Sequence, residues 1–180
     1  MRFFASGLLA AALAAGPAAA ALQPGVMAPD FSTAATLGGH EFQFHLADAL
    51  KKGPVVLYFY PAAFTSGCTV EAHNFAEATA DFAAQHATVI GVSQDNIAKL
   101  DKFSVTECRN KFAVASDASG AISKSYDAVL IGMLGYSDRT SYVISPEGKI
   151  LTAYHAMDPD GHVGQTMAAV KAWNLAHPGK

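Results

Sequence analysis

The chain has 180 residues and a formal net charge of −3 at pH 7, with 12 lysines and arginines against 15 aspartates and glutamates. So few basic residues, with no basic run, argue against nucleic-acid binding and against attraction to anionic lipid surfaces. The chain contains 2 cysteines. In an oxidising compartment these could form a simple structural bridge, so any other role must be argued from their positions.

Residues 1–20 have the pattern of a secretory signal peptide. Arg2 gives a positive start, an apolar run follows over residues 3–15, and small residues at 18–20 fit cleavage after residue 20. The apolar run of about 13 residues is shorter than the roughly 17–25 needed to span a bilayer. This favours a cleaved leader over a membrane anchor. We therefore expect residues 21–180 to form a single domain, exported to a bacterial periplasm without stable membrane insertion.

After the leader, the sequence alternates between strand and helix patterns. The predicted strands are His40–His45, Pro54–Tyr60, Thr88–Ser93 and Phe112–Ala115, followed by a hairpin of Ser141–Ser145 with Ile150–His155. The predicted helices are residues 67–85, Asn96–Glu107 and an amphipathic C-terminal helix that includes Val163–Trp173. This order indicates the α/β class, with a central mixed sheet flanked by helices on both faces. The thioredoxin-like fold is the compact arrangement of this kind.

Cys68 lies near the first turn of the predicted helix 67–85, directly after the buried strand Pro54–Tyr60. A thiol in this position faces unpaired backbone N–H groups and the positive end of the helix dipole, and both favour the thiolate. Thr65 and Ser66 add hydroxyl groups close to the sulfur. The position therefore favours a reactive cysteine over a buried structural one.

The residues around this cysteine resemble the active-site motif of the peroxiredoxin family. Pro61-x-x-x-Thr65-x-x-Cys68 matches that motif, and its surroundings are similar to the peroxiredoxin Q, or bacterioferritin comigratory protein, branch. The likeness extends to Ala28–Phe31, Tyr58–Pro61, Arg139–Ile144 and Gly148-Lys149, in the same order and spacing. The resemblance implies a thioredoxin-like fold and a thiol-dependent peroxidase. Such an enzyme reduces hydrogen peroxide and small alkyl hydroperoxides without metal, haem or flavin.

The resemblance also implies a role for each matching residue. Cys68 would be the peroxidatic cysteine, which attacks the O–O bond and becomes a sulfenic acid. Thr65 would hydrogen-bond the peroxide and the thiolate, and Pro61 would shield the sulfenic acid from water. Arg139 would supply positive charge from a neighbouring strand. Glu71, three residues after Cys68, is placed to orient Arg139, and a solvated helix carboxylate is the competing interpretation.

Ionisation of the thiol cannot by itself make a fast peroxidase. A thiol of pKa ~8.5 is about 3% thiolate at pH 7, so complete ionisation gains only roughly 30-fold. A lower pKa also reduces intrinsic nucleophilicity. The larger share must come from donors that stabilise charge as it moves onto the peroxide oxygens. Thr65, Arg139 and the backbone N–H of Cys68 are the expected donors.

Cys108 is the candidate resolving cysteine. Many Q-type proteins carry this cysteine five residues after the first, where this chain has His73, which we expect at the surface. A second Q-type pattern places it near the end of the next helix, as Cys108 is. The resemblance thus implies an intramolecular Cys68–Cys108 disulfide, reduced by thioredoxin or a thioredoxin-like protein. A buried free cysteine and a permanent bridge are alternatives, but the bridge would consume the thiol that the motif surrounds.

Two other functions fit the same residues. One is a thiol-disulfide oxidoreductase on this fold, although the chain lacks the C-x-x-C pair that such chemistry generally uses. The other is a redox-sensing or chaperone-like protein switched by oxidation of Cys68. A metal site is not expected, since His40 and His45 would point to opposite faces of a strand, and His155 and His162 bracket a loop without recognisable ligand spacing. We expect a monomer or a weak homodimer.

Overall fold

A computed structural model describes residues 21–133 and 135–178, so the predicted signal peptide lies outside the described residues. The strands are β1 (Ser32–Leu37), β2 (His40–His45), β3 (Val55–Phe59), β4 (Thr88–Ser93), β5 (Ala113–Ser116), β6 (Thr140–Ile144) and β7 (Ile150–His155). The helices are α1 (Leu46–Leu50), α2 (Ser66–Ala84), α3 (Ile97–Thr106), α4 (Ala121–Ser125), the 3₁₀ helix η1 (Pro159–Gly161) and α5 (His162–Ala176). None of the helices in these ranges is both long and apolar enough to cross a bilayer.

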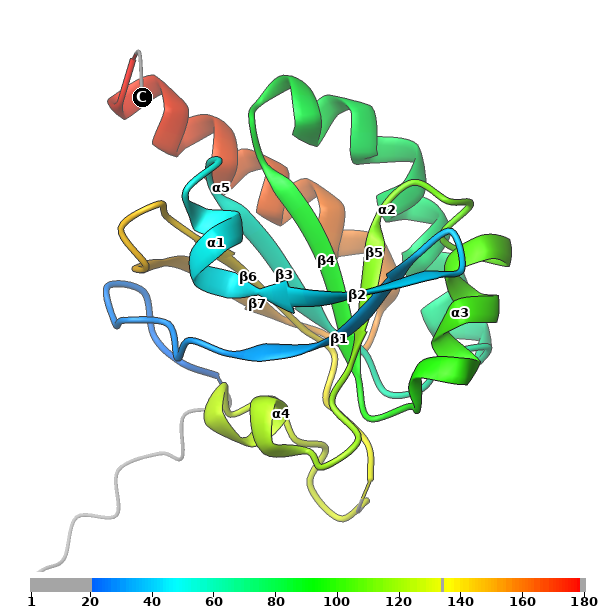
Figure 1. The fold of residues 1–180 in the computed structure, drawn as a ribbon. Helices are drawn as coiled ribbons and strands as arrows, with labels where there is room; N and C mark the ends of the chain where they lie inside the picture. Colours follow the sequence, from blue (N-terminus) through cyan, green and yellow to red (C-terminus); the bar gives the residue numbers. More distant parts are fainter. Residues whose placement is uncertain (1–20, 134, 179–180) are drawn as a thin grey trace, which may run out of the picture.

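The strands form one mixed sheet in the order β2-β1-β5-β4-β3-β6-β7 (Figure 1). The central strands β3, β4 and β5 run parallel to one another, whereas β6 pairs antiparallel with β3 on one side. β3 is buried along its whole length, as its continuous apolar sequence predicts for a strand covered on both faces. The predicted α/β class and mixed sheet are confirmed.

Alternate residues of β3 point into two separate cores, one on each face of the sheet. Val56 and Tyr58 belong to the core that also contains buried residues of α2, α3 and α5. Val55, Leu57 and Phe59 belong to the other core, which contains buried residues of α1 and the segment after α4. Both cysteines lie in the first core, so the two thiols share the face of the sheet that α2, α3 and α5 cover.

The sequence analysis did not predict β1. Its sequence, STAATL, lacks the large β-branched and aromatic residues that mark a strand. It forms a strand because Gly38 and Gly39, both with positive φ, make a tight connection that pairs it with β2. Its other edge pairs with β5. The predicted strand at 112–115 is displaced by one residue, to Ala113–Ser116.

Candidate active site

Cys68 is the third residue of α2, in the turn that follows the buried strand β3. Cys68 is 2% exposed, so its sulfur is buried at the N-terminal end of the helix. Phe64, in the loop between β3 and α2, has a left-handed backbone with φ of 67°. Its ring packs edge-on against Phe103 of α3 at 5.2 Å between ring centroids. This contact helps to hold a costly backbone conformation and fixes the loop ahead of Cys68.

Arg139 brings positive charge to the sulfur, as expected. It immediately precedes β6, which pairs with β3, and it is 3% exposed. Its Nη2 group donates to Cys68 Sγ at 3.4 Å, and its Nε group donates to the carbonyl of Met157 at 3.0 Å. A Cβ atom placed on Gly67 would lie 3.0 Å from Arg139 Nη2. Glycine at position 67 therefore leaves room for the guanidinium beside the sulfur.

Glu71 completes this cluster from the next turn of α2. Its Oε2 atom accepts a hydrogen bond from Arg139 Nη1, and the residue is fully buried. The interpretation of Glu71 as a solvated helix carboxylate is therefore wrong. Burial raises the pKa of Glu71 to about 8, against the opposing effect of the Arg139 charge. The carboxyl group thus holds the guanidinium of Arg139, while burial opposes ionisation of the carboxyl group.

Thr65 and Pro61 lie in the loop that leads to the cysteine. Thr65 is the N-cap residue of α2, and its hydroxyl donates to the carbonyl of Ala62 at 3.0 Å. This differs from the expected bond to the thiolate, because the single hydroxyl hydrogen is already used. The free lone pairs of this exposed hydroxyl can instead accept a hydrogen bond from a hydroperoxide. Pro61 is half-buried at the start of the loop.

Two residues behind Glu71 were missed by the sequence analysis. His162, the first residue of α5, is fully buried, and its Nδ1 atom lies 3.5 Å from Glu71 Oε1. The same Nδ1 lies 2.8 Å from Ser141 Oγ, and Nε2 lies 2.9 Å from the carbonyl of Ala156. Ser141 could have been found, because it is two residues after Arg139 on one strand and so shares its face. The position of His162 beside Glu71 depends on how α5 packs against α2, and no local sequence pattern predicts that packing.

Cys108 follows the C-terminal end of α3 and is fully buried. Both cysteines are free thiols. Burial, with a smaller effect of the neighbouring Glu107, raises the pKa of Cys108 well above its ordinary value. Cys108 is therefore a neutral thiol in this conformation. Of the predicted site residues, Arg139 and Glu71 thus lie in one bonded cluster with Cys68. Thr65 and Pro61 lie in the loop before it, and Cys108 lies in the same core.

A hydrogen bond and an ion pair connect the residues beside Cys108 to α2. His73 Nε2 lies 2.9 Å from Glu107 Oε2, and Arg109 Nη1 lies 3.3 Å from Glu77 Oε1. His73 is partly exposed, as predicted for a surface residue. The segment containing Cys108 is thus fastened to the helix that carries Cys68.

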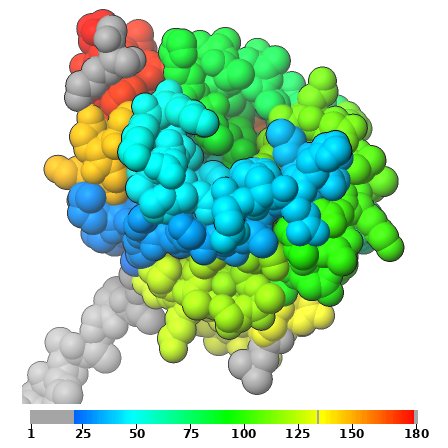
Figure 2. Space-filling model, in the orientation of Figure 1, coloured from blue at the N-terminus to red at the C-terminus, as the bar shows by residue number. Residues whose placement is uncertain are grey.

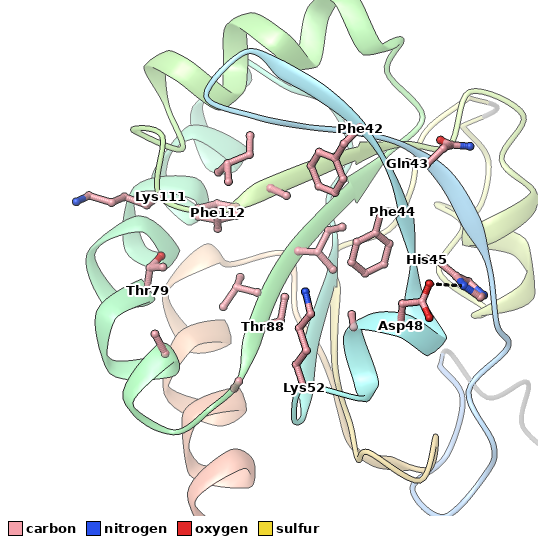
Figure 3. Close-up of a pocket in the computed structure, with 17 residues that line it drawn as sticks. Phe42, Gln43, Phe44, His45, Asp48, Lys52, Thr79, Thr88, Lys111 and Phe112 are labelled. Atoms are coloured by element: carbon pink, nitrogen blue, oxygen red, sulfur yellow. Dashed lines mark hydrogen bonds and ion pairs between the residues drawn. The ribbon is translucent and has the colours of Figure 1, made fainter.

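A hollow of about 460 Å³ lies away from this cluster, beside β2 and α1 (Figure 2). Its walls are mainly apolar, with Phe42 and Phe44 on one side and Lys52 reaching into the space (Figure 3). Neither cysteine lines it. The hollow is therefore separate from the thiol site. Within the described ranges, no group of three or more histidine, cysteine or acidic residues is arranged to hold a metal ion.

The fold and the cluster define a thiol-based redox protein, with a cysteine at a helix N-terminus and an arginine at its sulfur. The AhpC/TSA family model matches residues 24–153. A Mycobacterium tuberculosis peroxiredoxin is 35% identical over 130 residues, covering 71% of this chain and 84% of that protein. The peroxiredoxin Bcp of Xanthomonas campestris is 32% identical over 124 residues, covering 66% and 76%. The crystal structure of the peroxidoxin BcpB of M. tuberculosis superposes with a TM-score of 0.76 at 32% identity, covering 84% and 97%. The chain belongs to the AhpC/TSA family, within its peroxiredoxins, which are thiol-dependent peroxidases.

Proposed function

We propose that the chain reduces hydrogen peroxide and small alkyl hydroperoxides with Cys68 as the peroxidatic cysteine. The observation that carries this assignment is the hydrogen bond from Arg139 Nη2 to Cys68 Sγ at 3.4 Å. It places a fixed positive charge where a peroxide must approach the sulfur. Alkyl peroxide reduction is the activity described for the bacterioferritin comigratory protein of Xanthomonas campestris, a 29% identical structural relative.

The first step is a displacement on the peroxide. The Cys68 thiolate attacks the distal oxygen, a sulfur–oxygen bond forms and the O–O bond breaks. Sulfur is oxidised to the sulfenic acid, and the leaving oxygen takes a proton and departs as water or an alcohol. Arg139 stabilises the negative charge on the leaving oxygen, and the Thr65 hydroxyl accepts the hydrogen bond of the attacked peroxide.

The second step uses Cys108 as the resolving cysteine. Its thiol loses a proton, the thiolate attacks the sulfur of the Cys68 sulfenic acid, and the S–S bond forms as the S–O bond breaks. The leaving hydroxide takes up a proton and departs as water. Because burial keeps Cys108 neutral in this conformation, the segment around it must open before it can ionise and attack. The two Cα atoms must also come within about 4.4–6.8 Å. Local unwinding of the first turn of α2 and the end of α3 meets both requirements.

The catalytic cycle closes with an external dithiol. A thioredoxin-like protein reduces the Cys68–Cys108 disulfide and restores both thiols. The pattern of residues 1–20 supports export to a bacterial periplasm, so the reductant must operate there. Residues 21–180 then act as a single-domain monomer or weak homodimer.

Two measurements on purified protein test these assignments. Peroxide consumption with dithiothreitol should continue over many turnovers in the native protein and stop in Cys68→Ser. Stoichiometric oxidation without turnover would instead favour a redox sensor. Mass spectrometry of the non-reduced, peroxide-treated protein should show a Cys68–Cys108 disulfide, and Cys108→Ser should stop at the sulfenic acid. If a thioredoxin-like protein still reduced the oxidised Cys108→Ser variant and restored its activity, the resolving role of Cys108 would be overturned.

A further inference from the structure

We propose that His162 is a positioning residue of the peroxidatic centre. Together with Glu71 it retains one proton behind Arg139, so that the charge of the guanidinium stays available to Cys68. This inference rests on the proposed role of Cys68. It concerns two buried groups that the peroxidase reaction does not itself consume.

The hydrogen bonds of His162 fix where its ring hydrogen lies. Nε2 is 2.9 Å from the carbonyl oxygen of Ala156, which can only accept, so Nε2 carries a hydrogen. The neutral ring therefore has its lone pair at Nδ1. That atom faces Ser141 Oγ at 2.8 Å and Glu71 Oε1 at 3.5 Å.

The two carboxyl oxygens of Glu71 differ in their hydrogen bonding. Its Oε2 atom accepts from Arg139, whereas Oε1 is buried without a hydrogen-bond partner. If Glu71 were ionised and His162 neutral, a carboxylate oxygen and a ring lone pair would face each other in a site closed to water. An unsatisfied buried charge of this kind is costly. One proton, on either Oε1 or Nδ1, turns the repulsion into an attraction.

The same proton decides the charge behind the sulfur. An ionised Glu71 beside a neutral His162 would cancel the positive charge of Arg139. With one proton retained, the three groups carry a net charge of +1 whichever atom holds it. An opposite charge at this range favours an ionised thiol and an anionic leaving group. The retained proton therefore preserves the electrostatic function of Arg139.

The surroundings of the two groups favour a proton on Glu71 rather than on Nδ1 of His162. Burial raises the pKa of Glu71 to about 8, whereas burial lowers the pKa of His162. The charged or titratable groups that face His162 are Glu71 from α2, Arg139 before β6, Tyr154 and His155 from β7, and Asp158 before η1. Of these, Arg139 and His155 lower the pKa of His162 and Asp158 raises it.

A spectroscopic test measures the proton without any peroxide. Infrared difference spectra between native protein and Glu71→Gln at pH 7 should show the C=O band of a protonated carboxylic acid. Nitrogen NMR should show His162 as the neutral Nε2–H form. A doubly protonated His162 with an ionised Glu71 would also satisfy the proposal, because the pair still holds one proton. A neutral His162 beside an ionised Glu71 would overturn it.

A double-mutant cycle tests the consequence for Cys68. In His162→Asn the amide donates to Glu71 Oε1 and stabilises the carboxylate, so the Arg139 charge is cancelled. The rate of Cys68 alkylation by iodoacetamide at pH 7, located by mass spectrometry, should fall about 10-fold. Oxidation by peroxide should slow about 10-fold. With Glu71→Gln already present, adding His162→Asn should change either quantity less than about 2-fold.

The control is His177→Asn, the same substitution on the C-cap of the same helix, which should leave both quantities unchanged. If His162→Asn has the same effect in the Glu71→Gln variant as in the native protein, its role is structural and the proposal fails. The alkylation and spectroscopic measurements do not require turnover. They therefore remain decisive even if Cys68→Ser shows that peroxide reduction has another origin.

Discussion

Gly67 is the residue that allows Arg139 to reach the sulfur. The guanidinium is held by Glu71 and by the carbonyl of Met157, so it cannot retreat freely from an added methyl group. Gly67→Ala places a Cβ atom 3.0 Å from Nη2, the atom that donates to Cys68. We expect oxidation of Cys68 to slow by at least about 10-fold, since small misplacements at a reacting centre cost up to about 10²-fold.

Competition with a haem peroxidase for hydrogen peroxide measures this rate. Gly164→Ala provides the control, because a Cβ atom there meets no atom within 4 Å. Equal rates for Gly67→Ala and the native protein would show that the guanidinium has room to move without loss of function.

The candidate site was predictable where its residues are contiguous. Pro61, Thr65 and Cys68 form a local motif, and Arg139 was identified by resemblance in a second short segment. Glu71 was left undecided, because helix spacing gives its face but not what covers that face. His162 was considered only as a metal ligand and was set aside for lack of ligand spacing. Its contact with Glu71 exists only because α5 packs against α2, and that docking is a tertiary property without a local signal.

At the scale of elements, the segment after α3 has a strained backbone and is held in place by contacts with α2. Arg109 and Asn110 both have left-handed backbones, with φ of 52° and 57°, a conformation that is unfavourable for non-glycine residues. The hydrogen bond of Glu107 with His73 and the ion pair of Arg109 with Glu77 hold this strained segment against α2. Opening of the segment should therefore be easier when a pair is removed.

We expect His73→Ala to accelerate formation of the Cys68–Cys108 disulfide about 2- to 5-fold. A partly exposed polar pair of this kind contributes about 0.2–1 kcal/mol, and its loss destabilises the closed segment relative to the open one. Rapid quenching after a pulse of peroxide, followed by non-reducing mass spectrometry, gives the rate. Lys51→Ala removes a surface ion pair with Asp48 on α1 and should have no effect. A slower or unchanged rate in His73→Ala would show that the contact between His73 and Glu107 does not hold the segment closed.

The predicted helices and strands show the same difference: elements with a clear pattern in their own sequence were predicted, and elements that depend on distant partners were missed. β2, β4 and β7 were predicted with the bounds that the structure shows, because each has clear apolar patterning. β1 was missed since its residues are small and polar, and its pairing partners, rather than its own sequence, make it a strand. The five-residue helix α1 is also absent from the sequence prediction, because one turn is too short to establish a period.

At the scale of the whole molecule, Glu71 and His162 connect the site to the stability of the fold. The pKa of Glu71 rises from 4.5 to about 8 on burial, so the folded state binds more protons than the unfolded state between these values. Its contribution to stability is complete below pH 4.5 and is lost as pH rises toward 8. The pKa of His162 falls below 6.5 on burial, so its contribution has the opposite slope, below pH 6.5. The two slopes offset each other in that lower range, and only the Glu71 slope remains above it.

The native protein should therefore lose stability between pH 6.5 and 8 by up to about 1.4 kcal/mol per pH unit relative to Glu71→Gln. The introduced amide keeps an acceptor for Arg139 but has no proton to release, so that variant lacks the slope. Urea unfolding of both proteins under reducing conditions, at several pH values, gives the difference directly. Glu77→Gln, the same change at an exposed position of α2, should follow the native protein. Parallel stability curves for native protein and Glu71→Gln would mean that Glu71 is ionised throughout this range, and the retained proton behind Arg139 would then have to lie on His162.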